Sequence, residues 1–294
     1  MNFPLSELNK IRLAVQSPEA PDLLDQSLSN HQIDVACLQE TRIQGESKVE
    51  TKGYQILTNA YQENTGIHGV AIAISKRINN CVQVWKAVSA RVCMLIIEAM
   101  ATPATIISCY APIEEAESAT KVDFYQSLHA TVDDTPKGDL LRIGGDMNAK
   151  LGQAHIAESS YIGRAVKPSQ RNDNGDRLAL FSAYNDLCIA NTMFRKMIHQ
   201  FPTWCSRDRR TRNQIDFLLI RRRWRTSISD ARVRKDELLL DSDHRMLTCA
   251  LKSKLIVYKK TQKTQRLNHD LRQTAGGVQH DVLVNQKWSV SKKL

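Results

Sequence analysis

The sequence has no long hydrophobic run, no paired-cysteine motif and few aromatic residues. Its longest apolar stretch, residues 92–108, is interrupted by Glu98 and Pro103, so it lacks the roughly 18 uninterrupted apolar residues of a membrane-spanning helix. The N-terminus has no basic region followed by an apolar core, so we expect no secretory signal. The seven cysteines show no CxxC spacing. We therefore expect reduced core cysteines in an intracellular protein, with neither a zinc motif nor a disulfide framework.

The remaining composition is that of an ordinary globular protein. The 294 residues are 42% hydrophobic and 24% charged, which argues against a mainly disordered, collagen-like or membrane protein. A chain of this length forms one large domain or two small ones. It buries about three quarters of its unfolded surface and needs no covalent staples.

The formal net charge of +10 is unevenly distributed. Residues 205–235 carry eleven Lys or Arg against three Asp, and residues 252–294 carry ten Lys or Arg against two Asp. Such clustering suits a polyanion such as nucleic acid. A solvated surface and a solubilising tail explain the charge equally well.

Short apolar runs rich in β-branched side chains alternate with helical patterns. The strand-like runs are residues 33–38, 70–74, 92–99, 104–110, 140–143, 187–190 and 214–220, and the helical patterns are residues 23–28, 119–133 and 173–185. This mixture predicts a layered α/β or α+β domain. We expect that domain at residues 30–252, after an atypical N-terminus at residues 1–29. Residues 253–294 are expected to be a basic, mostly disordered extension, with one isolated helix as the alternative.

Polar side chains gather at the ends of the predicted strands, where α/β folds usually place ligand sites. They are Gln39-Glu40-Thr41, Tyr110-Ala111-Pro112, Gly145-Asp146-Met147-Asn148, Asn213-Gln214-Ile215-Asp216 and Ser242-Asp243-His244. Each group by itself has an ordinary explanation. Glu40 reads as a solvated carboxylate, Tyr110 as a packed aromatic, and Asp146 with Asn148 as turn formers. The pair Asp243-His244 is more specific, because a His beside a carboxylate is a frequent acid–base arrangement.

Taken together and in order, these five motifs resemble the endonuclease/exonuclease/phosphatase superfamily, which includes apurinic endonucleases and pancreatic-type deoxyribonuclease. More narrowly, the sequence resembles the endonuclease domain of non-LTR retrotransposons and the craniofacial development protein 2-like proteins derived from them. The resemblance is strongest over residues 33–42, 172–175 and 201–217, and it covers about residues 30–252. It implies a four-layer sandwich of two mixed β-sheets flanked by helices.

The resemblance also implies a metal centre and its histidine. Glu40 resembles the carboxylate that holds the divalent metal, Mg²⁺ with Mn²⁺ as the alternative. His244 resembles the imidazole at the scissile phosphate, with Asp243 as its partner and as a second metal contact. Asp216 resembles the carboxylate that pairs with an active-site histidine.

Three further residues match positions that handle water and phosphate in the family. Asp146 resembles the residue that orients or deprotonates the attacking water. Asn148 resembles a phosphate-positioning amide, and Tyr110 resembles a phosphate-contacting phenol. The identity of the base stays open, because these groups titrate as a coupled set. Nucleic-acid backbone contacts that do not read sequence are predicted for Trp204, Arg207, Arg209, Arg210, Arg212 and Arg223.

The N-terminus departs from the family pattern, which opens with a strand ending in Trp-Asn-Val or similar. The Asn of that motif is a metal-site residue. Asn9 lies thirty-one residues before Glu40, close to the expected separation, but no β-rich run precedes it. We therefore expect Asn9 in a helix or turn and the first strand to be missing or degenerate. The alternative is that Asn9 is a degenerate metal ligand.

The leading hypothesis is a Mg²⁺-dependent phosphodiester endonuclease acting on duplex DNA. No reverse transcriptase follows, so we expect a fragment or a stand-alone derivative of a retrotransposon. One rival is an enzyme of the same superfamily that cleaves a phosphoinositide or sphingomyelin head group. The other is a catalytically degenerate protein associated with nucleic acid or chromatin. We expect no membrane association and no obligate protein partner; a nuclear location follows only from the expected substrate.

Overall fold

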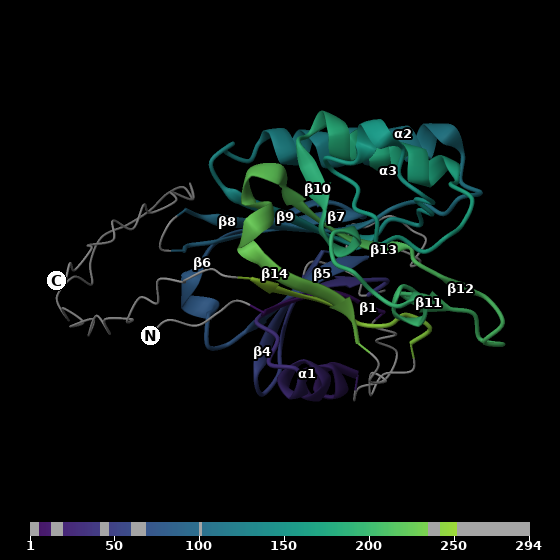
Figure 1. The fold of residues 1–294 in the computed structure, drawn as a ribbon. Coiled ribbons are helices and arrows are strands. Elements are labelled where there is room, and N and C mark those ends of the chain that lie inside the picture. The colour runs from purple at the N-terminus through teal and green to yellow at the C-terminus, as the bar shows by residue number, and fades with distance from the viewer. Residues whose placement is uncertain are drawn as a thin grey trace, which may run out of the picture. The chain divides into compact units, whose positions relative to one another are not determined.

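Two β-sheets pack face to face, and helices cover the outer face of each sheet (Figure 1). The structure is a computed structural model that describes residues 6–12, 20–41, 47–59, 69–99, 102–234 and 242–251, with the backbone alone for 6–12 and 47. The layers run helix, sheet, sheet, helix. The predicted α/β sandwich is therefore confirmed. The predicted extension at residues 253–294 lies outside the described residues.

The first sheet has seven strands in the order β14-β15-β1-β2-β5-β4-β3. Their bounds are β1 (Ser6–Arg12), β2 (Val35–Gln39), β3 (Ser47–Glu50), β4 (Tyr54–Asn59), β5 (Val70–Ser75), β14 (Ile228–Val233) and β15 (Leu247–Leu251). The sheet is mixed, because β1 and β2 run parallel while the other neighbours run antiparallel. Helix α1 (Ala20–Asn30) covers its outer face (Figure 1).

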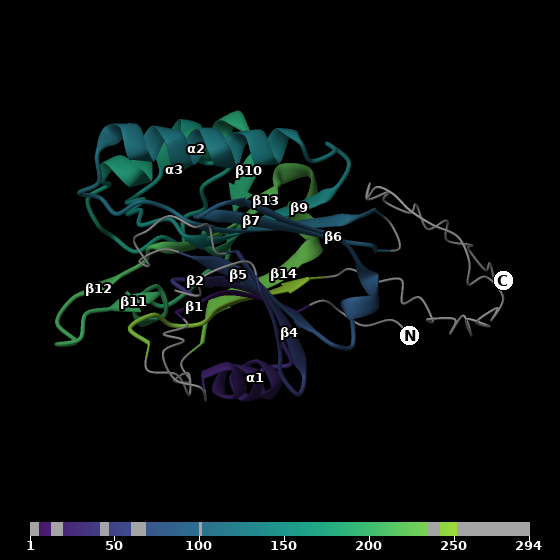
Figure 2. The ribbon, with the colours of Figure 1, turned by 180° about the vertical axis from the view of Figure 1, so that it is seen from behind.

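The second sheet has six strands in the order β10-β13-β9-β8-β7-β6. Their bounds are β6 (Val82–Ser89), β7 (Val92–Ile97), β8 (Ala104–Tyr110), β9 (Leu140–Asp146), β10 (Leu187–Ile189) and β13 (Asp216–Arg221). Helices α2 (Ser118–Asp133) and α3 (Asp173–Tyr184) cover its outer face, as Figure 2 shows from behind. Strands β8 and β9 are parallel, so this sheet is mixed too.

A short hairpin stands apart from both sheets. It consists of β11 (Trp204–Cys205) and β12 (Arg212–Asn213). Short 3₁₀ helices in the described part of the chain are Asn79–Cys81, Ile156–Glu158, Ala190–Thr192, Ile198–Gln200 and Arg222–Ser227. No described helix is both long and apolar enough to cross a membrane.

Alternation along the central strands explains the layering. In β5, Val70, Ile72 and Ile74 belong to the core between the sheets, whereas Ala71 and Ala73 belong to the core beneath α1. Side chains on a strand point to opposite faces in turn. Large residues therefore fill the space between the sheets, and small ones let α1 pack closely. Each large side chain buried in this way contributes roughly 1.5–3 kcal/mol.

The N-terminal segment corrects the sequence analysis. Residues 6–12 form strand β1, which pairs antiparallel with β15 and parallel with β2. Asn9 is paired with Leu247 and Cys37 in this strand, so the expectation of a helix or turn and of a missing first strand is wrong. The polar sequence gave little strand signal. Neighbours on both sides supply the hydrogen-bonding ladder, and this tertiary context overrides local propensity.

Candidate active site

Strands from both sheets bring the predicted polar residues together at one end of the sandwich. In the second sheet, Tyr110 at the end of β8 is in register with Asp146 at the end of β9, and Asp146 is in register with Asp216 at the start of β13. Registered neighbours point to the same face and lie on strands about 4.8 Å apart. These three side chains therefore form a row. From the first sheet, Glu40 follows β2 and His244 precedes β15.

A glycine allows β8 and β9 to approach closely beside this row. A Cβ atom placed on Gly145 would lie 2.0 Å from the carbonyl oxygen of Cys109, so no other residue fits there without moving the strand. Asp146 is the last residue of β9, and its Oδ1 accepts the backbone N–H of Asn148 at 2.9 Å, so it also begins the turn that follows the strand. Asn148 does adopt a left-handed backbone conformation, with φ of 47°.

Glu40 and Tyr110 connect the two sheets. The Tyr110 hydroxyl donates a hydrogen bond to Glu40 Oε1 at 3.2 Å. Glu40 also has a φ of 54°, a left-handed conformation that costs non-glycine residues about 1–3 kcal/mol and is concentrated at functional sites. Burial, followed by the charges of Glu40 and Asp146, raises the pKa of Tyr110. The phenol is therefore a hydrogen-bond donor at neutral pH.

His244 is held by a carboxylate in a region closed to solvent. Its Nδ1 lies 3.1 Å from Asp216 Oδ2, and His244 is 6% and Asp216 0% exposed. The backbone N–H of Asp216 donates to Thr203 Oγ1 at 3.1 Å, which anchors the aspartate. A carboxylate at Nδ1 favours the tautomer that carries its proton there. That tautomer leaves Nε2 as the ring atom for chemistry.

Asp243 lies on the other side of the imidazole. Its Oδ1 is 3.9 Å from His244 Nε2, while its Oδ2 accepts a 3.0 Å hydrogen bond from the indole N–H of Trp204. Trp204, predicted as a nucleic-acid contact, thus positions Asp243. Asp216, and not Asp243, is the closer partner of His244.

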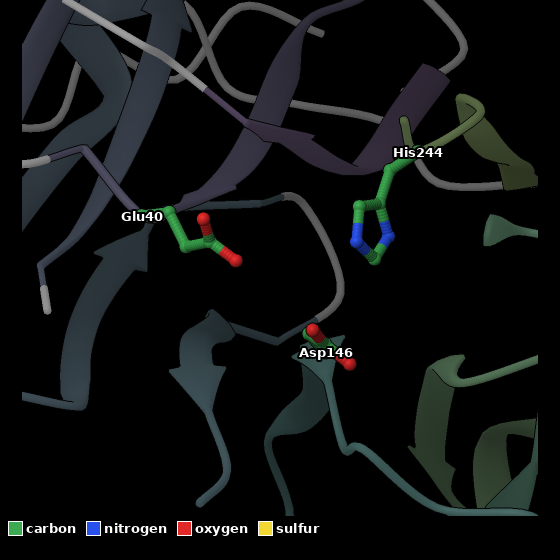
Figure 3. A group of neighbouring side chains, drawn as sticks. All are labelled: Glu40, Asp146 and His244. Carbon is green, nitrogen blue, oxygen red and sulfur yellow. The ribbon is translucent and has the colours of Figure 1, made fainter. Parts of the chain in front are cut away.

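Three side chains form a group suited to a cation. Glu40, Asp146 and His244 each offer one ligand atom, and these atoms all lie within 4.8 Å of one another. Figure 3 shows the three side chains turned toward a common space. Hard divalent cations prefer carboxylate oxygens, and two carboxylates leave room for water and phosphate oxygens. The donor set therefore fits a divalent metal ion.

Asn148 is fixed by a network that the sequence analysis did not identify. Its Nδ2 donates to the Ala111 carbonyl at 2.9 Å, and its backbone N–H donates to Asp146 Oδ1 at 2.9 Å. Its own carbonyl accepts from the Nδ2 atoms of Asn172 and Asn174 at 3.3 and 3.2 Å. Asn172 and Asn174 had stood out only within the family-like stretch 172–175. Their spacing alone gave no sign of this contact.

Most of the predicted nucleic-acid contacts lie beside this site. Four exposed arginines are carried by the hairpin β11–β12, namely Arg207, Arg209, Arg210 and Arg212. An isolated bridge between Trp204 and His244 fixes the hairpin next to the imidazole. Arg223 is elsewhere: it follows β13, which runs from Asp216 at the site to Arg221 at its other end. The structure does not bring Arg223 to the site.

The structure describes Asn9 by its backbone in β1 alone. Its strand places Arg12, three residues later, in register with Gln39, the neighbour of Glu40. The metal role of Asn9 stays a prediction.

Sequence comparison finds curated relatives, although no family model matches the chain. The chain is 31% identical over 254 residues to craniofacial development protein 2 of Bos taurus and 32% identical over 250 residues to that of Tragulus javanicus. These alignments cover 86% and 85% of the chain but 42% and 43% of the relatives. The chain therefore spans less than half the length of the curated relatives it matches.

Solved structures with a similar fold come from nucleases and a phosphatase. The endonuclease domain of TRAS1, a telomere-specific non-LTR retrotransposon, matches with a TM-score of 0.60 and 17% identity over 85% of this chain and 98% of that one. The Xenopus laevis APE2 catalytic domain gives 0.64 and 17%, over 87% and 94%. The 3′ phosphatase NExo from Neisseria, bound to a product DNA hairpin, gives 0.63 and 15%, over 84% and 99%. At these identities the likeness concerns the fold alone.

Proposed function

The chain has the endonuclease/exonuclease/phosphatase fold and is a relative of craniofacial development protein 2, and from this premise we propose that it is a metal-dependent phosphodiesterase that cleaves DNA. One observation carries the proposal: strand ends of two different sheets bring ligand atoms of Glu40, Asp146 and His244 within 4.8 Å of one another. Such a group, drawn from distant parts of the sequence, is suited to holding a metal and a phosphate together. The metal we propose is Mg²⁺, with Mn²⁺ as the alternative.

The two carboxylates would hold the cation. Glu40 and Asp146 supply the oxygen ligands that Mg²⁺ prefers, and Asp243 is a candidate second contact. When bound, the cation neutralises the charge of the phosphodiester and stabilises the charge that develops in the transition state.

The neighbouring side chains would divide the remaining work. Asp216 orients His244, whose Nε2 we assign to the scissile phosphate. Asp146 is oriented by the backbone N–H of Asn148 at 2.9 Å, and we assign it to the attacking water. Asn148 provides a neutral amide donor for a phosphate oxygen, and the Tyr110 hydroxyl would do the same by turning from Glu40 once that carboxylate holds the cation. Proton transfer by a positioned group contributes about 10²–10⁴-fold to rate.

A DNA substrate is supported by the charge around the site. The hairpin beside His244 exposes four arginines, which suits a polymer with many phosphates better than a single lipid head group. A fold neighbour was solved with a DNA hairpin bound. An origin from a retrotransposon is our interpretation of the likeness to the TRAS1 domain. The rival of a degenerate binding protein is disfavoured by the buried Asp216–His244 pair, because a dead copy has no need to keep it.

Plasmid nicking tests the proposal directly. The purified chain is incubated with supercoiled plasmid in Mg²⁺, in Mn²⁺ and in EDTA, beside Glu40→Ala and His244→Ala. The matched controls are Asp123→Ala, on helix α2, and His199→Ala, in the 3₁₀ helix Ile198–Gln200, which remove exposed side chains that the proposal gives no role. We expect metal-dependent nicking that is lost in the two site variants and kept in the controls. A folded wild-type protein that retards DNA without nicking it in either metal would overturn the proposal in favour of a binding protein.

A further inference from the structure

The row of site residues in the second sheet continues one strand beyond Tyr110, to Arg91. The backbone N–H of Tyr110 donates to the Arg91 carbonyl at 2.9 Å, and Arg91 Nη1 donates to the Tyr110 carbonyl at 3.2 Å. The guanidinium carbon also lies 5.4 Å from the centroid of the Tyr110 ring. Arg91 is thus fixed to Tyr110 through both its backbone and its side chain.

Arg91 belongs to the turn between β6 and β7, directly before Val92. Cys93, two residues later, belongs to the core between the sheets, so by strand alternation Arg91 is on the same face as the site. It is half-buried, which leaves it accessible to a ligand. Across the sheet the order is therefore Arg91, Tyr110, Asp146, Asp216. The positively charged guanidinium of Arg91 stands at one end of this row, and Asp216 holds the His244 imidazole at the other.

This order has an electrostatic consequence. The site concentrates the negative charges of Glu40, Asp146 and Asp216, which repel phosphate groups. A bound metal ion can offset this repulsion only for the one phosphate that it contacts. A nucleic-acid strand brings further phosphates into the same region. A guanidinium matches phosphate geometry through paired N–H donors. The contacts with the Tyr110 carbonyl and ring hold the guanidinium in place beforehand, so less conformational freedom is lost when a phosphate binds.

We infer that Arg91 binds the backbone phosphate adjacent to the scissile one, on the Tyr110 side of the site; this rests on the proposed function. The spacing of the strands supports the choice of phosphate. Arg91 is two strands from Asp146, about 10 Å at the backbone, and its Nη1 is held by the Tyr110 carbonyl on the side of β8 that faces away from β9, which favours the neighbouring phosphate over the one held between Glu40, Asp146 and His244. The alternative is a structural role, in which Arg91 merely covers the Tyr110 ring.

Two substrates separate these roles. Bis(4-nitrophenyl) phosphate has one phosphate and no neighbour, whereas a short DNA duplex has both. The full chain is compared with Arg91→Ala and Arg91→Lys, and with Arg225→Ala as a matched exposed arginine beyond the far end of β13. We measure kcat and KM for both substrates, the melting temperature, and the salt dependence of duplex binding by fluorescence anisotropy in EDTA.

For Arg91→Ala we expect a KM for the duplex raised about 10- to 100-fold, as for loss of a charge-assisted hydrogen bond. Its kcat/KM for bis(4-nitrophenyl) phosphate should stay within about 2-fold of wild type. The slope of log K against log salt should fall by about 1. Arg91→Lys should keep the wild-type salt slope but only part of the wild-type affinity, because lysine keeps the positive charge without the paired N–H donors of the guanidinium. Arg225→Ala should match wild type in all of these.

Three results would overturn the inference. An equal loss on both substrates would mean that Arg91 acts on the reacting centre through Tyr110. An unchanged KM and salt slope in a folded Arg91→Ala protein would leave only the structural role, while the nuclease itself would stand. A wild type that neither cleaves nor binds the duplex would overturn the proposed function together with this inference. If wild type binds without cleaving, the salt slope still decides for or against Arg91.

Discussion

Asp216 Oδ2 lies 3.1 Å from His244 Nδ1, although Asp216 begins β13 in the second sheet and His244 precedes β15 of the first. The hydrogen bond from Tyr110 to Glu40 also crosses between the sheets. One cross-sheet contact therefore stands on each side of the central carboxylate, Asp146. The geometry of the site depends on how the two sheets are packed, and not on any single loop.

Replacing Asp216 by Asn should disturb the orientation of the His244 imidazole without destabilising the fold. The variant keeps the size of the side chain and the backbone bond to Thr203, so the melting temperature should change little. It removes the charge that favours a proton on Nδ1, so we expect the nicking rate to fall about 10²- to 10⁴-fold. Single-turnover nicking under saturating Mg²⁺ measures this. Near-normal activity would mean that Asp243, and not Asp216, orients the imidazole.

Trp204 offers a test of positioning against DNA stacking. Trp204→Phe keeps an aromatic face but removes the N–H that binds Asp243 at 3.0 Å. We expect DNA affinity to be maintained and kcat to fall about 3- to 10-fold, in line with the loss of one hydrogen bond to a charged group that is partly accessible to water. Trp204→Ala serves as the companion variant. If both variants lose affinity and keep kcat, Trp204 is a nucleic-acid contact, as expected from the sequence.

The two sheets are also joined one layer below the site. Gln39 Nε2 donates to Ser108 Oγ at 3.0 Å, and Ser108 Oγ donates to the Leu38 carbonyl at 3.3 Å. Gln39 and Ser108 are both fully buried. Gln39 directly precedes Glu40, and Ser108 lies two residues before Tyr110. This bridge therefore sets the spacing of the two residues that connect the sheets above it.

A double-mutant cycle measures the bridge. Ser108→Ala leaves the buried Gln39 amide without its partner, and we expect unfolding free energy to fall by about 1–3 kcal/mol. Gln39→Met removes the amide, so the double variant should lose less than the sum of the single variants, with a coupling of about 0.5–3 kcal/mol. Urea denaturation gives these values. Strict additivity would show that the contact contributes nothing to the packing of the sheets.

Sequence patterns revealed the buried strands because these strands alternate or are apolar throughout. The predicted runs at residues 70–74 and 104–110 correspond to β5 and β8, which are buried on both faces along almost their whole length. Strand β6 is partly exposed along its length and gave no comparable signal. Strand β1 is central but polar, and its pairing with β15 and β2 forms only once the chain has folded.

The residues of the candidate site could be predicted from the sequence better than the contacts between them. Glu40, Asp146 and His244 were singled out by their places at strand ends, and the structure brings them together. Register decides which residues meet, and register depends on pairing between distant segments. For this reason Arg91 gave no signal, since nothing near it in sequence points to Tyr110. Arg223 lies in an arginine-rich segment, which suggested a nucleic-acid contact, but it follows the end of β13 that is opposite Asp216 and the site.

The hairpin arginines should control affinity and its dependence on salt. The loop is held by its own bonds, with Asp208 Oδ1 accepting from the Arg210 N–H at 3.1 Å and Ser206 Oγ from the Thr211 N–H at 2.9 Å, so removing arginine side chains should leave its backbone in place. The variant replaces the four exposed arginines by Ala, at Arg207, Arg209, Arg210 and Arg212. We expect the salt slope of duplex binding to fall by about 3 to 4, because each phosphate contact contributes about 0.9.

A matched control removes the arginines at the other end of β13, at Arg222, Arg223 and Arg225. If the hairpin is the DNA surface, this triple variant keeps most of the wild-type slope. A larger effect from the triple variant would move the DNA surface away from His244. It would also support the contact that the sequence analysis predicted for Arg223.

Acid should weaken the loop that follows Asn148 through one ion pair. Arg171 Nη1 and Nη2 contact the two carboxylate oxygens of Glu158 at 2.7 Å each, and Arg171 Nε donates to the Leu151 carbonyl at 2.6 Å. Hydrogen bonding from Arg171 is the main cause that lowers the pKa of Glu158 below its ordinary value of 4.5. A carboxyl whose pKa is lower in the folded state stabilises that state fully above its unfolded pKa. The stabilisation is lost as the pH falls through the folded pKa.

Glu158→Gln should therefore have an effect that depends on pH. At pH 7 we expect it to lower the free energy of unfolding by about 1–3 kcal/mol, since it leaves the half-buried guanidinium with only the exposed carboxylate of Asp176, 3.7 Å away, as a charged partner. At acid pH the wild-type protein loses this stabilisation as the pH falls through the lowered pKa of the folded Glu158 carboxyl, so the difference in unfolding free energy between the two proteins should narrow. Urea denaturation at both pH values checks this, with the exposed Glu115→Gln as control. A difference that stays constant with pH would mean that Glu158 acts through shape and neutral hydrogen bonds, and that the charge of the pair contributes nothing to holding the loop beside Asn148.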